Sequence, residues 1–263
     1  MCVHTRINQI GRLLLLGTAG LMVAGLLAAQ LHAQNYQVSQ NGKSVGTANL
    51  LLSKAAQGYT ATSGANIDMP GLKYKFTENE SLDAGYHLNT VQLNGTVNGT
   101  TATVNTAKLG AQFLMKINAN GKLTTTPLSA HAQAVFVPDF DPGALEVVLK
   151  LGAAHNNGDM WALVPKQEGS ITAIRIVTNA DMQGTLNGAP LAVHHFSVTF
   201  EGNKMELFSS PANDLLQAEW TDEGFAMVRQ GFKLTPPARA PAPPPPPAQP
   251  AATPQTQGQA VQQ

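Results

Sequence analysis

The sequence predicts a mainly β protein, in which an antiparallel sheet carries one short helix and is followed by a disordered tail. Three observations support this. Apolar and polar residues alternate over much of the segment 36–234, Asn-Gly pairs interrupt the alternation, and proline, alanine and glutamine dominate the segment 236–263. Alternation gives each strand one buried and one hydrated face, which is typical of antiparallel sheets.

The first 33 residues have the features of a secretion signal. Arg6 and Arg12 precede an apolar run over residues 13–29, and Ala33 supplies a small residue for cleavage. We expect cleavage after Ala33, with Ala29 as the other candidate, and an exported protein that is periplasmic or secreted. A retained signal anchor is the alternative, because the run approaches the length that spans a bilayer.

Composition limits the chemistry of the mature chain. The only cysteine, Cys2, lies in the predicted signal, so the mature protein would contain no disulfide and no thiol. The chain has 16 basic and 16 acidic side chains and no net charge. Without a global positive field we expect no nucleic-acid partner. The sequence does not determine the oligomeric state.

Asn-Gly pairs predict hairpin turns, because both residues readily take the positive φ angles of a type I′ turn. Several of these pairs separate alternating segments, as consecutive hairpins require. The pairs are Asn41-Gly42, Asn94-Gly95, Asn98-Gly99, Asn120-Gly121, Asn157-Gly158 and Asn187-Gly188.

The alternation also predicts the core. It is clearest over residues 195–201, where Phe196, Val198 and Phe200 share one face. The same pattern adds further core positions in other segments, namely Tyr74, Phe76, Phe113, Met115, Ile117, Ile174, Ile176, Leu216, Ala218, Trp220, Phe225 and Met227.

One segment breaks the β pattern. Asp141 is a candidate N-cap, Pro142 suits the first helical position, and Gly152 suits the end of a helix. These signals predict a short helix over residues 141–151, packed against the sheet.

The domain should occupy residues 34–235. Residues 236–263 lack side chains that could build a core, so we expect an extended tail with polyproline II character. We expect removal of this tail to leave the melting temperature nearly unchanged.

No group of residues predicts catalysis or metal binding. His194 and His195 are adjacent, so on a strand they point to opposite faces and cannot readily bind one metal ion together. Glu78 and Glu80 lie in a polar stretch that resembles a strand end, and Asp139 and Asp141 lack the further oxygen ligands that a calcium loop needs. Neither a G-x-S-x-G elbow nor an S-x-x-K pair is present. We therefore assign no catalytic, metal or cofactor residue and expect no enzyme activity.

A resemblance rests on short motifs. Tyr36-x-Val38 with Gly42, Val45 and Gly46, the segment 188–198, and Trp220-x-Asp222-x-Gly224 resemble exported bacterial β-sheet families of unknown function. Those families are similar to lipoprotein-carrier half-barrels. The resemblance covers residues 36–234 and implies a curved sheet, a half-barrel or open barrel, around a short helix. The threonine-rich segment 96–106 departs from the pattern.

We therefore expect an envelope protein that holds an apolar small molecule or lipid inside its curved sheet. One alternative is a structural or interaction module that reaches an envelope partner through its proline-rich tail, and another is a secreted hydrolase. The residues predicted to line the apolar site are Leu145, Val148, Leu149, Phe113, Met115, Phe196, Val198, Phe200 and Trp220.

Overall fold

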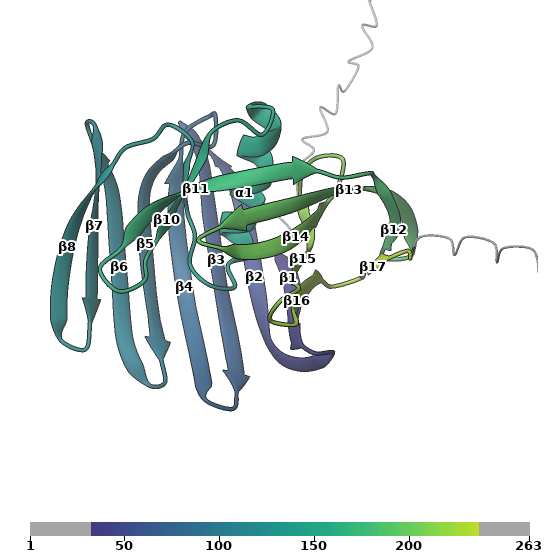
Figure 1. Cartoon of the computed structure of the whole chain (residues 1–263), viewed down its shortest axis with the longest axis horizontal. Helices are drawn as coiled ribbons and strands as arrows, with labels where there is room; N and C mark the ends of the chain where they lie inside the picture. Colours follow the sequence, from purple (N-terminus) through teal and green to yellow (C-terminus); the bar gives the residue numbers. More distant parts are fainter. Residues whose placement is uncertain (1–32, 237–263) are drawn as a thin grey trace, which may run out of the picture. The chain divides into compact units, whose positions relative to one another are not determined.

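The computed structural model describes residues 33–236, and these form one large, mainly antiparallel sheet that is not closed into a barrel (Figure 1). Residues 1–32 and 237–263, which hold nearly all of the predicted signal peptide and tail, lie outside the described part. The strands are β1 (Gln34–Gln40), β2 (Lys43–Ala55), β3 (Gly58–Met69), β4 (Leu72–Leu82), β5 (Leu88–Val97), β6 (Thr100–Leu109), β7 (Gln112–Ala119), β8 (Lys122–Ser129), β9 (Ala134–Phe136), β10 (Met160–Val164), β11 (Ser170–Thr178), β12 (Met182–Leu186), β13 (Ala189–Phe200), β14 (Asn203–Ser209), β15 (Leu215–Trp220), β16 (Phe225–Arg229) and β17 (Phe232–Leu234).

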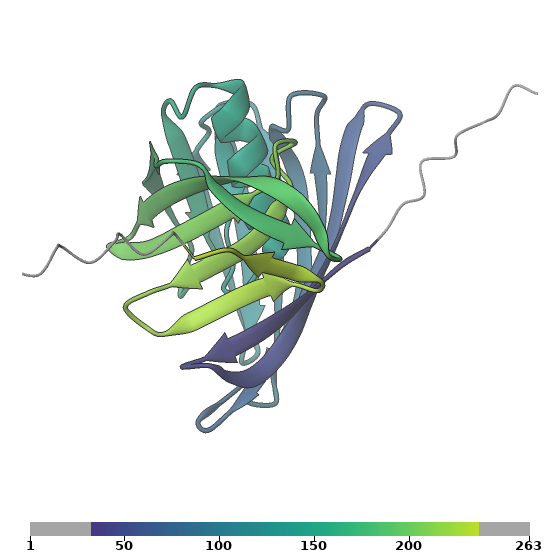
Figure 2. The ribbon, with the colours of Figure 1, turned by 90° about the vertical axis from the view of Figure 1, so that its right-hand side faces the viewer.

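The ladder pairs give the order of the sheet. From β8 each strand pairs with its predecessor back to β1, and β1 pairs with β16. The ladder continues through β15, β14, β13, β11 and β10 to β9, and β12 and β17 extend it beside β13. All of these pairs are antiparallel except β9 with β10. The long strands thus form one layer and the later strands a second one (Figure 2).

The helix α1 (Pro142–Ala154) lies between the two layers, where it packs on β2 and β3 of one layer and on β15 of the other (Figures 1 and 2). Ten of its residues are buried, and its apolar side chains complete the main core. The curved sheet around a short helix, predicted from the sequence, is confirmed. Within the described residues no helix is long and apolar enough to cross a membrane.

The start of α1 agrees with the prediction and its end does not. Asp141 is the N-cap, and its side chain accepts hydrogen bonds from the backbone of Gly143 and Ala144. The helix continues through Gly152 to Ala154, so the expected end at residue 151 is wrong. Positive φ angles at Asn156 and Asn157 reverse the chain instead, and the Asn157 N–H donates to the Gly152 carbonyl.

Four Asn-Gly pairs form the expected hairpin turns. The pairs at residues 41–42, 98–99, 120–121 and 187–188 have positive φ at both positions and connect consecutive strands. Asn94-Gly95 does not form a turn, because it lies inside β5. There Gly95 pairs with Phe76, and a Cβ on Gly95 would lie 2.5 Å from the Lys75 carbonyl oxygen. Glycine is required at this position for a close approach between strands.

Candidate functional site

A cavity of about 270 Å³ lies between the N-terminus of α1 and the two layers of the sheet. The loop from β9 to α1 forms one wall, and the ends of β3, β10, β13 and β15 with the starts of β4, β14 and β16 form the others. Its lining residues are Met69, Leu72, Val137, Pro138, Asp139, Phe140, Asp141, Leu145, Val164, Lys166, Phe200, Asn203, Met205, Trp220, Glu223 and Phe225. Most of them are apolar, as in binding sites for small apolar ligands.

Three aromatic side chains form one wall of this cavity. The ring of Phe140 lies 5.6 Å from that of Trp220 and 5.0 Å from that of Phe225, the second pair in an edge-to-face arrangement. Phe140 has a φ of 57°, which is unfavourable for a bulky side chain and costs on the order of 1–3 kcal/mol. Packing against the rings of Trp220 and Phe225 contributes to offsetting this cost.

Charged groups lie at the rim. Asp139 Oδ1 is 3.0 Å from Lys166 Nζ, and both side chains are about half exposed. Glu223 is exposed in the turn between β15 and β16. An ion pair this exposed adds little to stability, yet it places both signs of charge beside an apolar cavity.

Asp141 is one of the residues that line the cavity. Its carboxylate is buried and accepts from the N–H groups of Gly143 at 2.9 Å and Ala144 at 3.0 Å. Burial raises the pKa of this carboxyl, while hydrogen bonds from Ser63 and from the two backbone N–H groups lower it. The start of the helix therefore holds a buried carboxyl group beside the cavity.

Two further buried carboxyl groups, those of Glu78 and Glu80, lie in the sheet near Asp141. Both lie within β4, not at a strand end as the sequence suggested, and their i, i+2 spacing turns both side chains toward the core. Glu78 Oε2 and both carboxyl oxygens of Glu80 have no hydrogen-bond partner among the described residues. Burial raises the pKa of both groups, and the charge of Asp141 raises them further. Both carboxyl groups therefore favour the protonated form more strongly than an exposed glutamate does.

The structure distributes the nine predicted lining residues over two environments. Leu145, Phe200 and Trp220 line the cavity. The others pack in the main core, Phe196 half-buried and the rest fully buried, namely Val148, Leu149, Phe113, Met115 and Val198.

The sequence analysis missed the side chains that close the cavity from the β9–α1 loop. Phe140 is the clearest case, because an isolated phenylalanine in a Pro- and Asp-rich loop shows neither alternation nor helical periodicity. The pair Asp141-Pro142 was the available signal. It fixed the start of the helix but did not indicate that the preceding residue turns inward.

A serine, a histidine and a glutamate meet on β13 and β14, but not as a catalytic triad. Glu206 Oε2 lies 2.8 Å from His195 Nε2, and the Ser197 hydroxyl donates to the same carboxylate oxygen at 2.8 Å. In a triad the serine would bond to the imidazole and the imidazole to the acid. Here Glu206 lies between the two, so Ser197 is not activated. His194 bonds instead to Asp181, which agrees with opposite directions for the two adjacent histidines.

Within residues 33–236 no group of three or more His, Cys, Asp or Glu side chains has a geometry that could hold a metal ion. Asp139 and Asp141, which the sequence places close together, have separate roles. Asp139 pairs with Lys166 at the rim, and Asp141 caps the helix.

Comparisons with known proteins give one distant structural likeness. No family model matches the chain, and no curated protein matches it. A crystal structure of a DUF1089 family protein from Pseudomonas aeruginosa aligns with 67% of this chain and 90% of its own, at 12% sequence identity and a TM-score of 0.42. A likeness at this level carries no argument about function, which must come from the chain's own residues.

Proposed function

We propose that this protein is a non-enzymatic, exported binding protein that holds a small apolar molecule, or one end of a longer lipid, in the cavity beside the N-terminus of α1. The observation that carries this proposal is the cavity itself, with Phe140 held in an unfavourable backbone conformation as part of its aromatic wall. Unfavourable backbone conformations cluster at ligand sites, where they fix the shape that the ligand meets.

The size of the cavity limits the ligand. Pockets for small molecules commonly have volumes of about 300–1,000 Å³, and this cavity, at about 270 Å³, lies just below that range. A short acyl chain or a single ring system would fit within it. A longer lipid would insert one end and leave the remainder at the rim, beside Lys166 and Asp139.

Export is part of the proposal, with a periplasmic or secreted location. It is supported by the charged and apolar segments of residues 1–33 and by the start of β1 at Gln34, directly after the expected cleavage site. The hydrolase alternative is not favoured, because the hydroxyl of Ser197 bonds to Glu206 and not to His195.

The test combines extraction with titration. Protein purified from its own envelope is analysed by native mass spectrometry and organic extraction, and fluorescent fatty acids of short and long chain are then titrated into it. We expect saturable binding that is strongest for the short chain. No co-purified molecule together with no saturable binding would overturn the proposal.

A matched pair of variants locates the site. Leu72 and Leu51 are both half-buried leucines on long strands, but only Leu72 lines the cavity. L72W should fill the mouth and weaken binding at least tenfold, while L51W should leave it unchanged. Equal effects of both substitutions would show that the ligand binds elsewhere.

A further inference from the structure

The acidic residues that line the cavity beside the N-terminus of α1 outnumber the basic ones. Asp139, Asp141 and Glu223 are among its lining residues, and Lys166 is the one basic residue among them. Lys166 Nζ lies 3.0 Å from Asp139 Oδ1, so its charge is already paired. Asp141 and Glu223 take part in no ion pair within residues 33–236. The electrostatic potential of this lining therefore favours a positively charged ligand.

The charged residues that are buried inside the domain are acidic as well. Within the described residues they are Glu78, Glu80, Asp141 and Glu146, with no lysine or arginine. Glu146 Oε1 lies 3.8 Å from Lys150 Nζ, while the other three carboxyl groups belong to no ion pair in this part of the chain. Buried carboxyl groups are normally paired with a cation or kept protonated. Around Asp141 the described chain provides no such cation.

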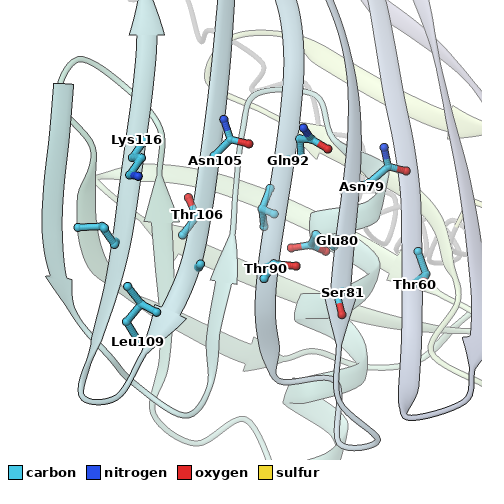
Figure 3. A pocket seen from close by; sticks show the side chains of 13 residues that line it. Thr60, Asn79, Glu80, Ser81, Thr90, Gln92, Asn105, Thr106, Leu109 and Lys116 are labelled. Atoms are coloured by element: carbon cyan, nitrogen blue, oxygen red, sulfur yellow. The ribbon is translucent and has the colours of Figure 1, made fainter. Parts of the chain in front are cut away.

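Two of these carboxyl groups have oxygens without a partner. On the outer face of the long-strand layer Asn79, Gln92 and Asn105 form one row (Figure 3). Glu80 follows Asn79 on β4, so its side chain points to the opposite, inner face, where it is 1% exposed. Both of its carboxyl oxygens, and Glu78 Oε2, have no hydrogen-bond partner among the described residues. Buried polar atoms are almost always hydrogen-bonded, so this group can still accept a donor.

Asp141 couples this buried group to the cavity. It is one of the lining residues, and its charge raises the pKa of both Glu78 and Glu80. Like charges close together disfavour ionisation, whereas a positive charge beside them favours it. A cation bound in the cavity would therefore be attracted by Asp141 and would reduce the repulsion among the three carboxyl groups.

An anion finds no comparable site at the start of α1. Pro142, the first residue of the helix, carries no N–H. The next two N–H groups donate to the Asp141 carboxylate, and the third donates to the Asp141 carbonyl oxygen. The positive end of the helix is thus satisfied by the chain's own groups, and a second carboxylate would be repelled by Asp141.

The aromatic wall of the cavity suits an ammonium group. The ring of Phe140 is inclined by 56° to that of Trp220 and by 71° to that of Phe225, so the three rings form a corner and not a flat stack. The face of an aromatic ring attracts a cation that lies within about 6 Å of its centre, and tryptophan does so most strongly. Several aromatic rings around one space form the cages that bind ammonium groups in other proteins.

We propose that the cavity binds a small cationic amphiphile, a short alkyl chain that ends in one ammonium group. The alkyl chain packs on apolar lining residues such as Leu72, Val164 and Met205. The ammonium group lies at the aromatic corner, where the carboxylates of Asp141 and Glu223 balance its charge. The ligand occupies the cavity of the proposed function, so the assignment of its charge rests on that proposal.

Three ligands with the same alkyl chain separate the charge of the ligand from its apolar part. Octylamine, octanol and octanoate are titrated into the mature chain at neutral pH and followed by isothermal titration calorimetry. We expect octylamine to bind at least about tenfold more tightly than octanol, because a desolvated cation–π contact adds to the charge attraction. Octanoate should bind most weakly, because Asp141 and Glu223 repel its carboxylate.

The ratio of the octylamine affinity to the octanol affinity is the readout for variants, because octanol reports whether the cavity is intact. E223Q removes an exposed charge at the rim and should lower this ratio by roughly three- to fivefold. D141N keeps the shape of the side chain and should lower the ratio by at least about tenfold, since the lost charge is buried. The control D159N removes an exposed acid before β10, whose opposite end lines the cavity, and should leave the ratio unchanged.

The contrary results distinguish the charge of the ligand from the cavity itself. If octanol or octanoate binds as tightly as octylamine, the assigned charge is wrong and the apolar cavity stands. If none of the three ligands binds, the proposed function fails together with this proposal. If D159N lowers the ratio as much as E223Q does, the preference for the amine does not come from this cavity, and the proposal is overturned.

Discussion

Replacement of Glu80 by glutamine should change how the stability of the protein depends on pH. Glu80 is 1% exposed, both of its carboxyl oxygens lack a partner, and burial raises its pKa. In the unfolded chain a glutamate ionises near its ordinary pKa of about 4.3. Above that pH, unfolding therefore releases a proton that the folded state retains.

The direction and the size of the pH dependence follow from the difference between the folded and the unfolded pKa of Glu80. Because the folded pKa is raised, the group contributes its full stability below the unfolded pKa and loses it as the pH rises toward the folded pKa. Each such carboxyl lowers the free energy of unfolding by about 1.4 kcal/mol per pH unit within that window. The pKa of Glu78 is also raised by burial, so this carboxyl acts in the same direction.

The variant E80Q has nearly the same shape and does not titrate. Its slope should be smaller by about 1.4 kcal/mol per pH unit within that window, so the stability of E80Q relative to the unchanged protein should increase as the pH rises above about 4.3. Urea denaturation at pH 5, 6, 7 and 8 measures this. The control E168Q removes a glutamate that is 72% exposed and should leave the slope unchanged. Equal slopes for E80Q and the unchanged protein would refute the protonated, unpartnered state of Glu80.

Four further predictions concern the helix, the cavity, the polar cluster and processing. D141A should lower the free energy of unfolding by about 1 kcal/mol through loss of the helix cap, and D141N should retain most of it, as urea denaturation would report. F140G relieves the backbone strain but removes the aromatic wall. The loss of binding free energy for a fluorescent fatty acid should therefore exceed the loss of unfolding free energy, and unchanged affinity would contradict the assigned cavity. S197A should leave ester hydrolysis at the level of the unchanged protein, because Ser197 bonds to Glu206; a loss of activity would contradict that connectivity. Intact-mass measurement of protein from its native host should give a chain that begins at Gln34, and a retained Met1 would exclude cleavage.

Local signals in the sequence account for much of the fold. Asn41, Asn98, Asn120 and Asn187 each precede a glycine and each turns the chain between two strands. These turns depend on backbone conformations that Asn and Gly adopt readily in any context. The start of α1 is local in the same sense, since Asp141 and the backbone N–H groups it caps lie within three residues.

The candidate site was predictable only in part. Leu145, Phe200 and Trp220 line the cavity, and periodicity identified all three as apolar and inward-facing. Periodicity cannot distinguish these from Phe113 or Met115, which are fully buried in the core. Whether an inward side chain meets another side chain or an empty space depends on the fit between elements that are distant in sequence.

The sequence by itself determined the strand pattern, the hairpin turns and the helix cap, because each is specified by residues within one turn or one strand. Only the tertiary structure decided that Glu78 and Glu80 are buried together near Asp141, some sixty residues further along the chain, and that Phe140 closes a cavity. It also decided that Asn79, Gln92 and Asn105 form one row. Burial and strand register depend on contacts between segments that are distant in the sequence, so they cannot be predicted from neighbouring residues alone.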